Sequence, residues 1–365
     1  MIQDRYFPPK LLEDQLNKWL KKTSILIIGS SVENRPIKSI TLGGGDLKIL
    51  LWSQMHGDES TTTRALMQLI PWLLATEQKP LRDSLSVCII PQLNPDGAFA
   101  YTRENANGID LNRDAINLSQ PESKCLKKFF HFFKPDYCFN LHDQRTIYGI
   151  DSFSVPATLS FLAPAADNSR KITAARSEAM KLIFDIAAHL TDDLPNGIGR
   201  FDDTFNPNCV GDTFSSLATP TLLFEAGHYQ NDYSRSKTGG FVLKALQKAL
   251  QSIASQDYQS KRVEEYFSIP ENSKSFYDLL LIGATIVSEG KTAKNQFLVL
   301  QYEERLQNEK LFFLPRMVAY SSEKPLQKFH REIKLSDKLK NKQIHFSINK
   351  IFKKPPFDKL LSVFS

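Results

Sequence analysis

Two histidines and a glutamate carry the strongest chemical signal in the sequence. His56 and Glu59 stand three residues apart in His-Gly-Asp-Glu, and His142 closes the stretch Phe-Asn-Leu-His. Two imidazoles and one carboxylate make a complete set of protein ligands for a catalytic zinc ion, which leaves its fourth position open. An offset of three residues places His56 and Glu59 on one side of a helical turn. The three residues are therefore candidate ligands of one zinc ion per chain, and the motifs described below decide this assignment.

Apolar runs next to these residues indicate the elements that position them. Residues 48–53 are typical of a buried strand, and residues 60–75 have helical spacing. His56 is therefore expected in the connecting turn, with Glu59 at the first helical turn. His142 follows a second strand-like run, 137–141. Because open α/β sheets build their sites at the carboxyl ends of strands, we expect these two strand ends to be neighbours.

The whole first part of the chain alternates between strand-like and helical segments. Strand-like runs lie at 25–28, 37–41, 48–53, 86–90, 137–141 and 221–225, and helical runs lie at 10–21, 60–76, 121–133, 169–190 and 234–254. This alternation predicts an α/β sheet covered by helices on both faces. Residues 192–216 are rich in Asp, Asn, Gly, Pro and Thr, which indicates a long and functional loop.

The alternation of strand-like and helical runs ends at about residue 260. Runs at 276–288, 296–302 and 311–320 are typical of strands separated by polar turns. We therefore predict a catalytic domain over 1–258 and a small, mostly β accessory domain with a basic tail over 259–365. The net charge of +6 gathers in this tail, since Lys324 to Lys359 contain eleven Lys or Arg and three Asp or Glu. Without a nucleic-acid motif, the basic segment is best interpreted as a solvated face.

Five motifs occur in an order that resembles the zinc carboxypeptidase family, the M14 metallopeptidases. They are Gly29-Ser-Ser-Val-Glu-Asn-Arg-Pro-Ile37, His56-Gly-Asp-Glu59, Asn94-Pro-Asp-Gly97, Arg103-Glu-Asn-Ala-Asn-Gly-Ile-Asp-Leu-Asn-Arg113 and Leu223-Phe-Glu225. An HxxE pair alone arises often by chance, so the ordered set carries the resemblance, over about residues 20 to 250. The resemblance implies a mixed, mostly parallel sheet flanked by helices. It also implies that His56, Glu59 and His142 are the zinc ligands.

The resemblance assigns two further carboxylates. Asp110 matches the family's aspartate that supports the first zinc histidine, where a carboxylate fixes the imidazole tautomer and raises its basicity. Glu225 matches the catalytic glutamate, the general base that takes a proton from the attacking water and returns it to the leaving amine. Glu225 ends an apolar run at 220–224, which places it at the carboxyl edge of the sheet.

The same resemblance implies a substrate site built from three polar residues. Arg103 matches the arginine that polarises the scissile carbonyl. Asn112 and Arg113 match the pair that binds the substrate's terminal carboxylate, a task that suits the two-pronged guanidinium. The sequence departs from the family at the substrate-capping tyrosine, because no tyrosine occurs from Asp151 to His228. His228 itself is best interpreted as a structural histidine.

Three functions remain open on these residues. The first is a zinc-dependent metallocarboxypeptidase-like hydrolase that cleaves a C-terminal amide bond of a small peptide or peptide-like substrate. The second is a zinc-dependent deacylase of N-acyl amino acids, related to the succinylglutamate desuccinylase and aspartoacylase branch. The missing tyrosine and the accessory domain keep this alternative open, whereas the complete Asn94–Gly97 and Asp110–Arg113 motifs favour the peptidase. The third is a catalytically silent binding module, against which the complete ligand set and Glu225 argue.

The composition is ordinary for a soluble globular protein. The chain has 365 residues, of which 41% are hydrophobic and 24% are charged. We expect no signal peptide, no membrane span and no nucleic-acid partner. Four cysteines without ligand spacing predict reduced thiols and a cytoplasmic location. The sequence leaves the oligomeric state open.

Overall fold

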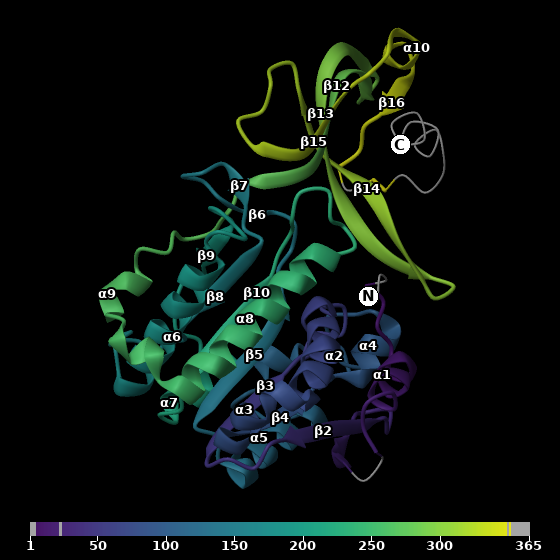
Figure 1. Ribbon diagram of the computed structural model, residues 1–365. Coiled ribbons are helices and arrows are strands. Elements are labelled where there is room, and N and C mark those ends of the chain that lie inside the picture. The colour runs from purple at the N-terminus through teal and green to yellow at the C-terminus, as the bar shows by residue number, and fades with distance from the viewer. Residues whose placement is uncertain (1–4, 22–23, 349, 352–365) are drawn as a thin grey trace. The chain divides into compact units, whose positions relative to one another are not determined.

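A mixed eight-stranded sheet organises the larger of two structural units (Figure 1). The computed structural model describes residues 5–21, 24–348 and 350–351. The strands lie in the order β1 (Ile25–Ser30), β2 (Pro36–Leu42), β4 (Leu85–Ile90), β3 (Leu47–Trp52), β5 (Tyr137–Asp143), β10 (Thr221–Ala226), β8 (Leu159–Leu162) and β9 (Ile198–Arg200). The central neighbours β4, β3, β5 and β10 are parallel. The predicted mixed, mostly parallel sheet is confirmed.

Helices cover both faces of this sheet, as the alternation predicted. Ile49 and Leu51 of β3 belong to one hydrophobic core and Leu50 and Trp52 to the other, because successive side chains of a strand point to opposite faces. The first core includes α1 (Pro9–Leu16), α2 (Thr61–Leu74), α3 (Lys79–Ser84), α6 (Ala174–Leu190) and α8 (Ser236–Ser255). The second core includes α5 (Pro121–Phe133) and α7 (Val210–Ser216).

The prediction of a long loop over residues 192–216 is wrong in part, because β9 and α7 lie within this segment. Both elements are too short to show a hydrophobic period in the sequence. Phe214 fixes α7 to the sheet, with its ring 5.4 Å from Trp52 and 4.0 Å from Phe130. The segment is therefore a packed part of the larger unit.

Residues 259–272 also pack into the larger unit, whereas the sequence suggested a boundary at 258. The two units divide after Asn272, and Thr146–Gly149 is counted with the smaller unit. Tyr258 and Tyr266 explain the difference, because both are buried in the first core. Tyr258 Oη lies 2.6 Å from Tyr137 Oη, and Tyr266 Oη accepts a hydrogen bond from Ala163 N.

Truncation of Tyr266 tests whether this stretch stabilises the larger unit. Tyr266→Ala removes a ring that is 1% exposed, so we expect a loss of about 3 to 5 kcal/mol in the free energy of unfolding. The neighbouring Phe267 is 47% exposed, and Phe267→Ala should cost less than about 1 kcal/mol. Urea unfolding followed by tryptophan fluorescence measures both, because all three tryptophans lie in the larger unit. Equal losses in the two variants would contradict the assignment.

The smaller unit is a sheet of antiparallel hairpins with two added parallel strands. Its strands are β12 (Phe276–Ser288), β13 (Lys291–Gln307), β14 (Lys310–Ser321), β15 (Lys328–Lys334) and β16 (Gln343–His345). Glu289-Gly290 and Asn308-Glu309 turn the two hairpins with positive φ at both positions, the conformation that two-residue hairpin loops require. Leu279, Leu298 and Met317 anchor its separate core. The three predicted strands are confirmed, and β15 and β16 are additions.

Three further expectations from the sequence concern the basic tail, membrane-spanning helices and the cysteines. Residues 352–365 of the basic tail lie outside the described residues. Within the described part of the chain, no helix is both long and apolar enough to cross a membrane. Cys88, Cys125, Cys138 and Cys209 are free thiols.

Candidate metal centre and active site

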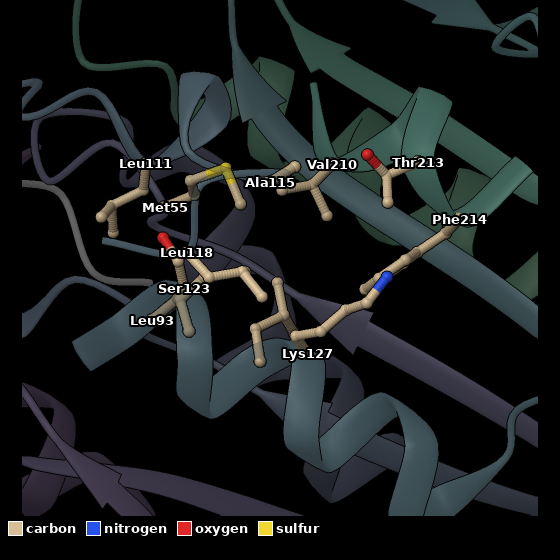
Figure 2. Close-up of a pocket in the computed structure, with 11 residues that line it drawn as sticks. Met55, Leu93, Leu111, Ala115, Leu118, Ser123, Lys127, Val210, Thr213 and Phe214 are labelled. Carbon is tan, nitrogen blue, oxygen red and sulfur yellow. The ribbon is translucent and has the colours of Figure 1, made fainter. Parts of the chain in front are cut away.

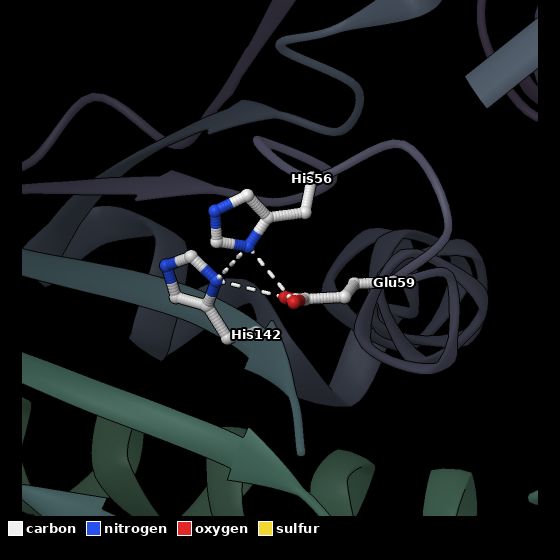
Figure 3. Close-up of side chains that lie close together, drawn as sticks. All are labelled: His56, Glu59 and His142. Carbon is white, nitrogen blue, oxygen red and sulfur yellow. Dashed lines mark hydrogen bonds and ion pairs between the residues drawn. The ribbon is translucent and has the colours of Figure 1, made fainter. Parts of the chain in front are cut away.

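His56, Glu59 and His142 converge on one point at the carboxyl edge of the sheet (Figure 3). Glu59 Oε1 lies 2.8 Å from His56 Nδ1, and Glu59 Oε2 lies 2.8 Å from His142 Nδ1. The two Nδ1 atoms are 3.1 Å apart. All three side chains are nearly excluded from solvent. Two side chains of the turn between β3 and α2 and one side chain of β5 thus form one compact cluster.

Close packing of two glycine-containing turns fixes the backbone around His56. A Cβ on Gly57 would lie 1.9 Å from the carbonyl carbon of Gly97, so any larger residue at 57 would displace the Asn94–Gly97 turn. Asn94 in turn donates from Nδ2 to Met55 O over 3.2 Å, and its Oδ1 accepts from Gly97 N over 2.8 Å. The His-Gly-Asp-Glu and Asn-Pro-Asp-Gly motifs therefore form one structural unit.

Asp96 joins this unit to the motif at residues 29–37. Its carboxylate accepts hydrogen bonds from Ser31 Oγ over 2.7 Å and from Glu33 N over 2.9 Å. Arg35 Nη1 donates to Asp96 Oδ1 over 2.6 Å. Asp96 is buried, so these charge-assisted bonds fix the position of the turn.

Glu59 lies in the turn before α2, whereas the sequence analysis placed it at the first helical turn. The helix begins at Thr61 after the N-cap residue Ser60, and Glu59 N donates to His56 O over 3.2 Å. Asp143, which the sequence did not single out, ties this turn to β5. Its backbone N donates to Glu59 Oε2 over 3.0 Å, and its carboxylate accepts from Thr61 N over 2.9 Å. Asp143 thereby joins the carboxyl end of β5 to the start of α2.

Asp110 and Arg103 surround the cluster on its open side. Asp110 Oδ1 lies 3.0 Å from His56 Nε2. Arg103 donates from Nε and Nη2 to Asp110 Oδ2 and from Nη1 to Glu59 Oε1, at 3.2, 3.0 and 3.1 Å. An Nε2–H given to Asp110 leaves the Nδ1 lone pair of His56 facing the cluster, which is the tautomer that binds a metal.

The electrostatics of the cluster favour a positive charge at its centre. Burial lowers the pKa of His56, but the charge of Glu59 and the hydrogen bond with Asp110 outweigh burial and raise the pKa to about 9. Burial raises the pKa of Glu59, yet the charges of His56 and His142 hold it well below its ordinary value. The buried carboxylate therefore stays ionised and attracts a cation.

The donor set fits a zinc ion. The candidate ligand atoms all lie within 4.8 Å of one another. Two imidazole nitrogens and a carboxylate are ligands that zinc commonly takes, and three of them leave the coordination shell open to water or substrate. A cation bound between the two Nδ1 atoms would accept both of their lone pairs at once.

Glu225 lies on β10 at the same level of the sheet as His142. The parallel register of β5 and β10 pairs His142 with Glu225. Glu225 Oε2 is enclosed and has no hydrogen-bond partner among the described residues. Burial, together with the negative charge of Glu59, raises the pKa of Glu225 well above its ordinary value. A carboxylate beside a cation site with an unused oxygen can accept and release a proton.

Asn112 and Arg113 follow Asp110 in a short 3-10 turn but make their contacts elsewhere. Asn112 Oδ1 accepts from Val210 N over 2.9 Å. Arg113 is exposed, and its Nη1 donates to Asn112 O over 2.7 Å and to Cys209 Sγ over 3.0 Å. The structure thus brings Arg103 and Asp110 to the His-Glu-His cluster and leaves the Arg113 guanidinium beside the start of α7.

A small apolar pocket lies behind the turn that carries these residues (Figure 2). Leu111 is fully buried and lines this pocket together with Met55 and Val210. Met55 precedes His56, and Leu111 separates Asp110 from Asn112. The buried leucine therefore anchors the turn while its polar neighbours contact His56 and α7.

The two tyrosines that follow Glu225 are held in ring contacts. The Tyr233 ring lies 4.7 Å from that of His228, which is fully buried, and the Tyr229 ring lies 5.6 Å from that of Phe241. Thr158 Oγ1 donates to His228 O over 2.9 Å. These contacts explain His228 as a packed residue.

Sequence comparison relates the first part of the chain to a known family. The family model described as zinc carboxypeptidase, Peptidase_M14, matches residues 13–156, the stretch that holds the whole His-Glu-His cluster. Residues 13–156 are therefore similar to the zinc carboxypeptidase family, the M14 metallopeptidases. Members of this M14 family are zinc-dependent hydrolases.

Curated M14 relatives match over part of their length. Carboxypeptidase SOL1 of Arabidopsis thaliana is 30% identical over 138 residues, which cover 32% of this chain and 28% of that protein. Probable carboxypeptidase 2 of Trichophyton verrucosum is 28% identical over 116 residues, which cover 31% of this chain and 21% of that protein. The chain therefore spans between a fifth and a third of the length of these relatives.

Solved M14 structures share the fold of the larger unit. A metallo-carboxypeptidase from Burkholderia cenocepacia has a TM-score of 0.54 at 16% identity and covers 68% of this chain and 71% of its own. A metallo-carboxypeptidase from Pseudomonas aeruginosa, solved with (2-guanidinoethylmercapto)succinic acid, has a TM-score of 0.55 at 17% identity, with 72% and 71% covered. At these identities the likeness concerns the fold.

Proposed function

We propose that this protein is a zinc-dependent, metallocarboxypeptidase-like hydrolase that cleaves the C-terminal amide bond of a small peptide or peptide-like substrate. One observation carries the proposal: three metal-ligand side chains converge, and a glutamate with an unpaired oxygen stands at the same register on the next strand. This combination suits hydrolysis by a water molecule, since a cation site and a base are both present.

Two histidines and one glutamate would hold the metal. We assign His56 Nδ1, the Glu59 carboxylate and His142 Nδ1 as its ligands, with Asp110 fixing the His56 tautomer. When bound, zinc supplies Lewis acidity and lowers the pKa of water towards about 7. The protein's part is to orient the ligands, and the short contacts of Asp110 and Asp143 to them serve that task.

Glu225 is assigned the proton transfers. Its Oε2 would take the proton from the attacking water as the new carbon–oxygen bond forms. The same oxygen would then deliver that proton to the amine nitrogen as the carbon–nitrogen bond breaks. One group can serve both steps because the proton it accepts is the proton it releases.

Arg103, Asn112 and Arg113 are assigned to the substrate. Arg103 lies against Glu59, so its guanidinium is close enough to the cluster to stabilise negative charge on the oxygen of the scissile carbonyl. Arg113 is exposed at the turn beyond Asp110, where its remaining donors are available to a terminal carboxylate beside the Asn112 amide.

Arg113→Ala should chiefly weaken binding of substrates that carry a free terminal carboxylate. Loss of a charge-assisted hydrogen bond predicts a rise in KM of about 10- to 100-fold, with a smaller change in kcat. Steady-state kinetics on one peptide with a free and with an amidated C-terminus measures this. Arg305→Ala, in a hairpin of the smaller unit, serves as the control and should keep parent values. Equal hydrolysis of the free and amidated peptides by the parent enzyme would contradict the exopeptidase assignment.

A substrate panel tests the proposed function as a whole. The panel contains short peptides with free C-termini, their amidated forms and N-acyl amino acids, each with and without a chelator. We expect chelator-sensitive cleavage of free-carboxylate peptides. Cleavage restricted to N-acyl amino acids would favour the deacylase, whose candidacy rests on the absence of a tyrosine between Asp151 and His228. No cleavage by the zinc-loaded protein would favour a binding module.

A further inference from the structure

We infer that Arg235 is a positioning residue, which sets the separation of the two strand ends that carry His142 and Glu225. The inference rests on the proposed function, because it concerns the geometry of the same site. Arg235 lies more than ninety residues after His142 in the sequence, and none of the five motifs contains it.

The guanidinium of Arg235 bridges the carboxyl ends of β5 and β10. Nη1 donates to Ala226 O over 2.6 Å, and Nη2 donates to Gln144 O over 2.9 Å. Ala226 directly follows Glu225, and Gln144 lies two residues after His142. Gln144 N also donates to Ala226 O over 2.9 Å, so both strand ends meet at this point. Since the prongs of a guanidinium have a fixed width, the bridge fixes the distance between the two carbonyls.

The backbone holds Arg235 in an uncommon conformation to aim this side chain. Its φ is +57°, a region that residues with a Cβ seldom adopt. Asp232 enforces the turn by accepting from Ser236 N and Lys237 N at 3.0 and 2.8 Å, which caps α8. Arg235 O then accepts from Gly239 N over 2.8 Å. The start of α8 is thus built to direct a side chain that is 1% exposed into the sheet edge.

The residue between His142 and Gln144 links this strand end to the third ligand. The Asp143 carboxylate accepts from Thr61 N, and its backbone N donates to Glu59 Oε2. Arg235 therefore acts on His142 and Glu225 through the backbone at the ends of β5 and β10.

Two substitutions at Arg235 and one matched control test this role. Arg235→Met keeps the length of the side chain and removes both hydrogen bonds, and Arg235→Lys retains the charge but can replace the fixed fork with only one donor group. Arg82→Met is the control, because Arg82 likewise donates to two carbonyls, those of Leu73 and Ala75, at the opposite end of α2 from Glu59. For each full-length variant, the measurements are thermal unfolding, zinc affinity, the visible spectrum of the Co²⁺-loaded protein, and kcat and KM.

We expect Arg235→Met to lower zinc affinity by about 10- to 100-fold and to change the Co²⁺ spectrum. At saturating metal its kcat should fall at least about tenfold with KM within about threefold, because misplaced catalytic groups affect the reaction more than binding. Arg235→Lys should fall between Arg235→Met and the parent. Arg82→Met should lose stability but keep the parent spectrum and kcat.

A folded Arg235→Met protein with parent zinc affinity, Co²⁺ spectrum and kcat would overturn the inference. If Arg235→Met fails to fold, Arg235→Lys decides, and parent values for its spectrum and affinity would overturn the inference equally. A parent protein that binds metal but cleaves nothing in the panel would refute the proposed function alone. The Co²⁺ spectrum and the zinc affinity of the Arg235 variants would then still test the positioning role of Arg235.

Discussion

Glu225→Gln should lower kcat at least about 100-fold while zinc content and thermal unfolding stay at parent values. Glutamine keeps the shape of the side chain and cannot take a proton from water at neutral pH. Glu225 Oε2 makes no hydrogen bond to a described residue, so the amide costs no contact in the folded state. The loss should therefore appear in the rate constant alone.

Pre-steady-state and steady-state kinetics on the best substrate of the panel measure this effect, with zinc content from elemental analysis. Glu77→Gln is the matched control, because Glu77 is an exposed glutamate in the larger unit and should give parent kinetics. Glu225→Asp keeps a carboxylate as the base but shortens the side chain by one methylene group, so it should retain more activity than Glu225→Gln. A Glu225→Gln enzyme with near-parent kcat would show that another group is the base.

His142→Ala should abolish stoichiometric zinc binding and, with it, turnover. Removal of one of three ligands costs more than the 10- to 100-fold that is typical when an outer-shell partner of a ligand is lost, so we expect zinc affinity to fall by more than about 100-fold. Zinc content after dialysis, and competition with a chromogenic chelator, give the two measurements. Glu59 keeps His56 and Arg103 as partners after this change, so the apo protein should stay folded.

Two further variants bracket this result. His189→Ala removes an exposed histidine of α6 and should keep one zinc per chain. Asp110→Asn keeps all three ligands and weakens only the hydrogen bond that supports His56. Its zinc affinity should therefore lie between those of His142→Ala and His189→Ala. Equal zinc content in His142→Ala and the parent would refute the ligand assignment.

Much of the fold was predictable because its central strands are buried on both faces. Such strands appear in the sequence as continuous apolar runs, and each of the six predicted runs overlaps a strand of the central sheet. The cluster of His56, Glu59 and His142 was predictable because two of its members share one turn and the third ends such a run. Short elements such as β9 and α7 show no periodicity, and packing against the sheet is what stabilises them.

The residues that orient the site were the hardest to predict. Asp143 and Arg235 act largely through backbone groups, with Asp143 N on Glu59 and the Arg235 guanidinium on two carbonyls. Every residue presents the same backbone atoms, so such contacts leave no pattern of side-chain types in the sequence. The predicted boundary at 258 and the division of the two units after Asn272 differ for a related reason, since only tertiary packing shows that Tyr266 belongs to the first core.

The membership of Thr146–Gly149 in the smaller unit has a consequence for synthesis on the ribosome. This segment directly follows the strand that carries His142, yet its partner in the smaller unit is the strand at Ser273–Lys274, with Gly149 opposite Ser273. The smaller unit therefore cannot be completed until everything between these segments has left the ribosome. The strands β8, β9 and β10 lie in the stretch of chain between these two paired segments, so they emerge before the pairing can form. Folding of the accessory unit is thereby made to follow the emergence of Glu225.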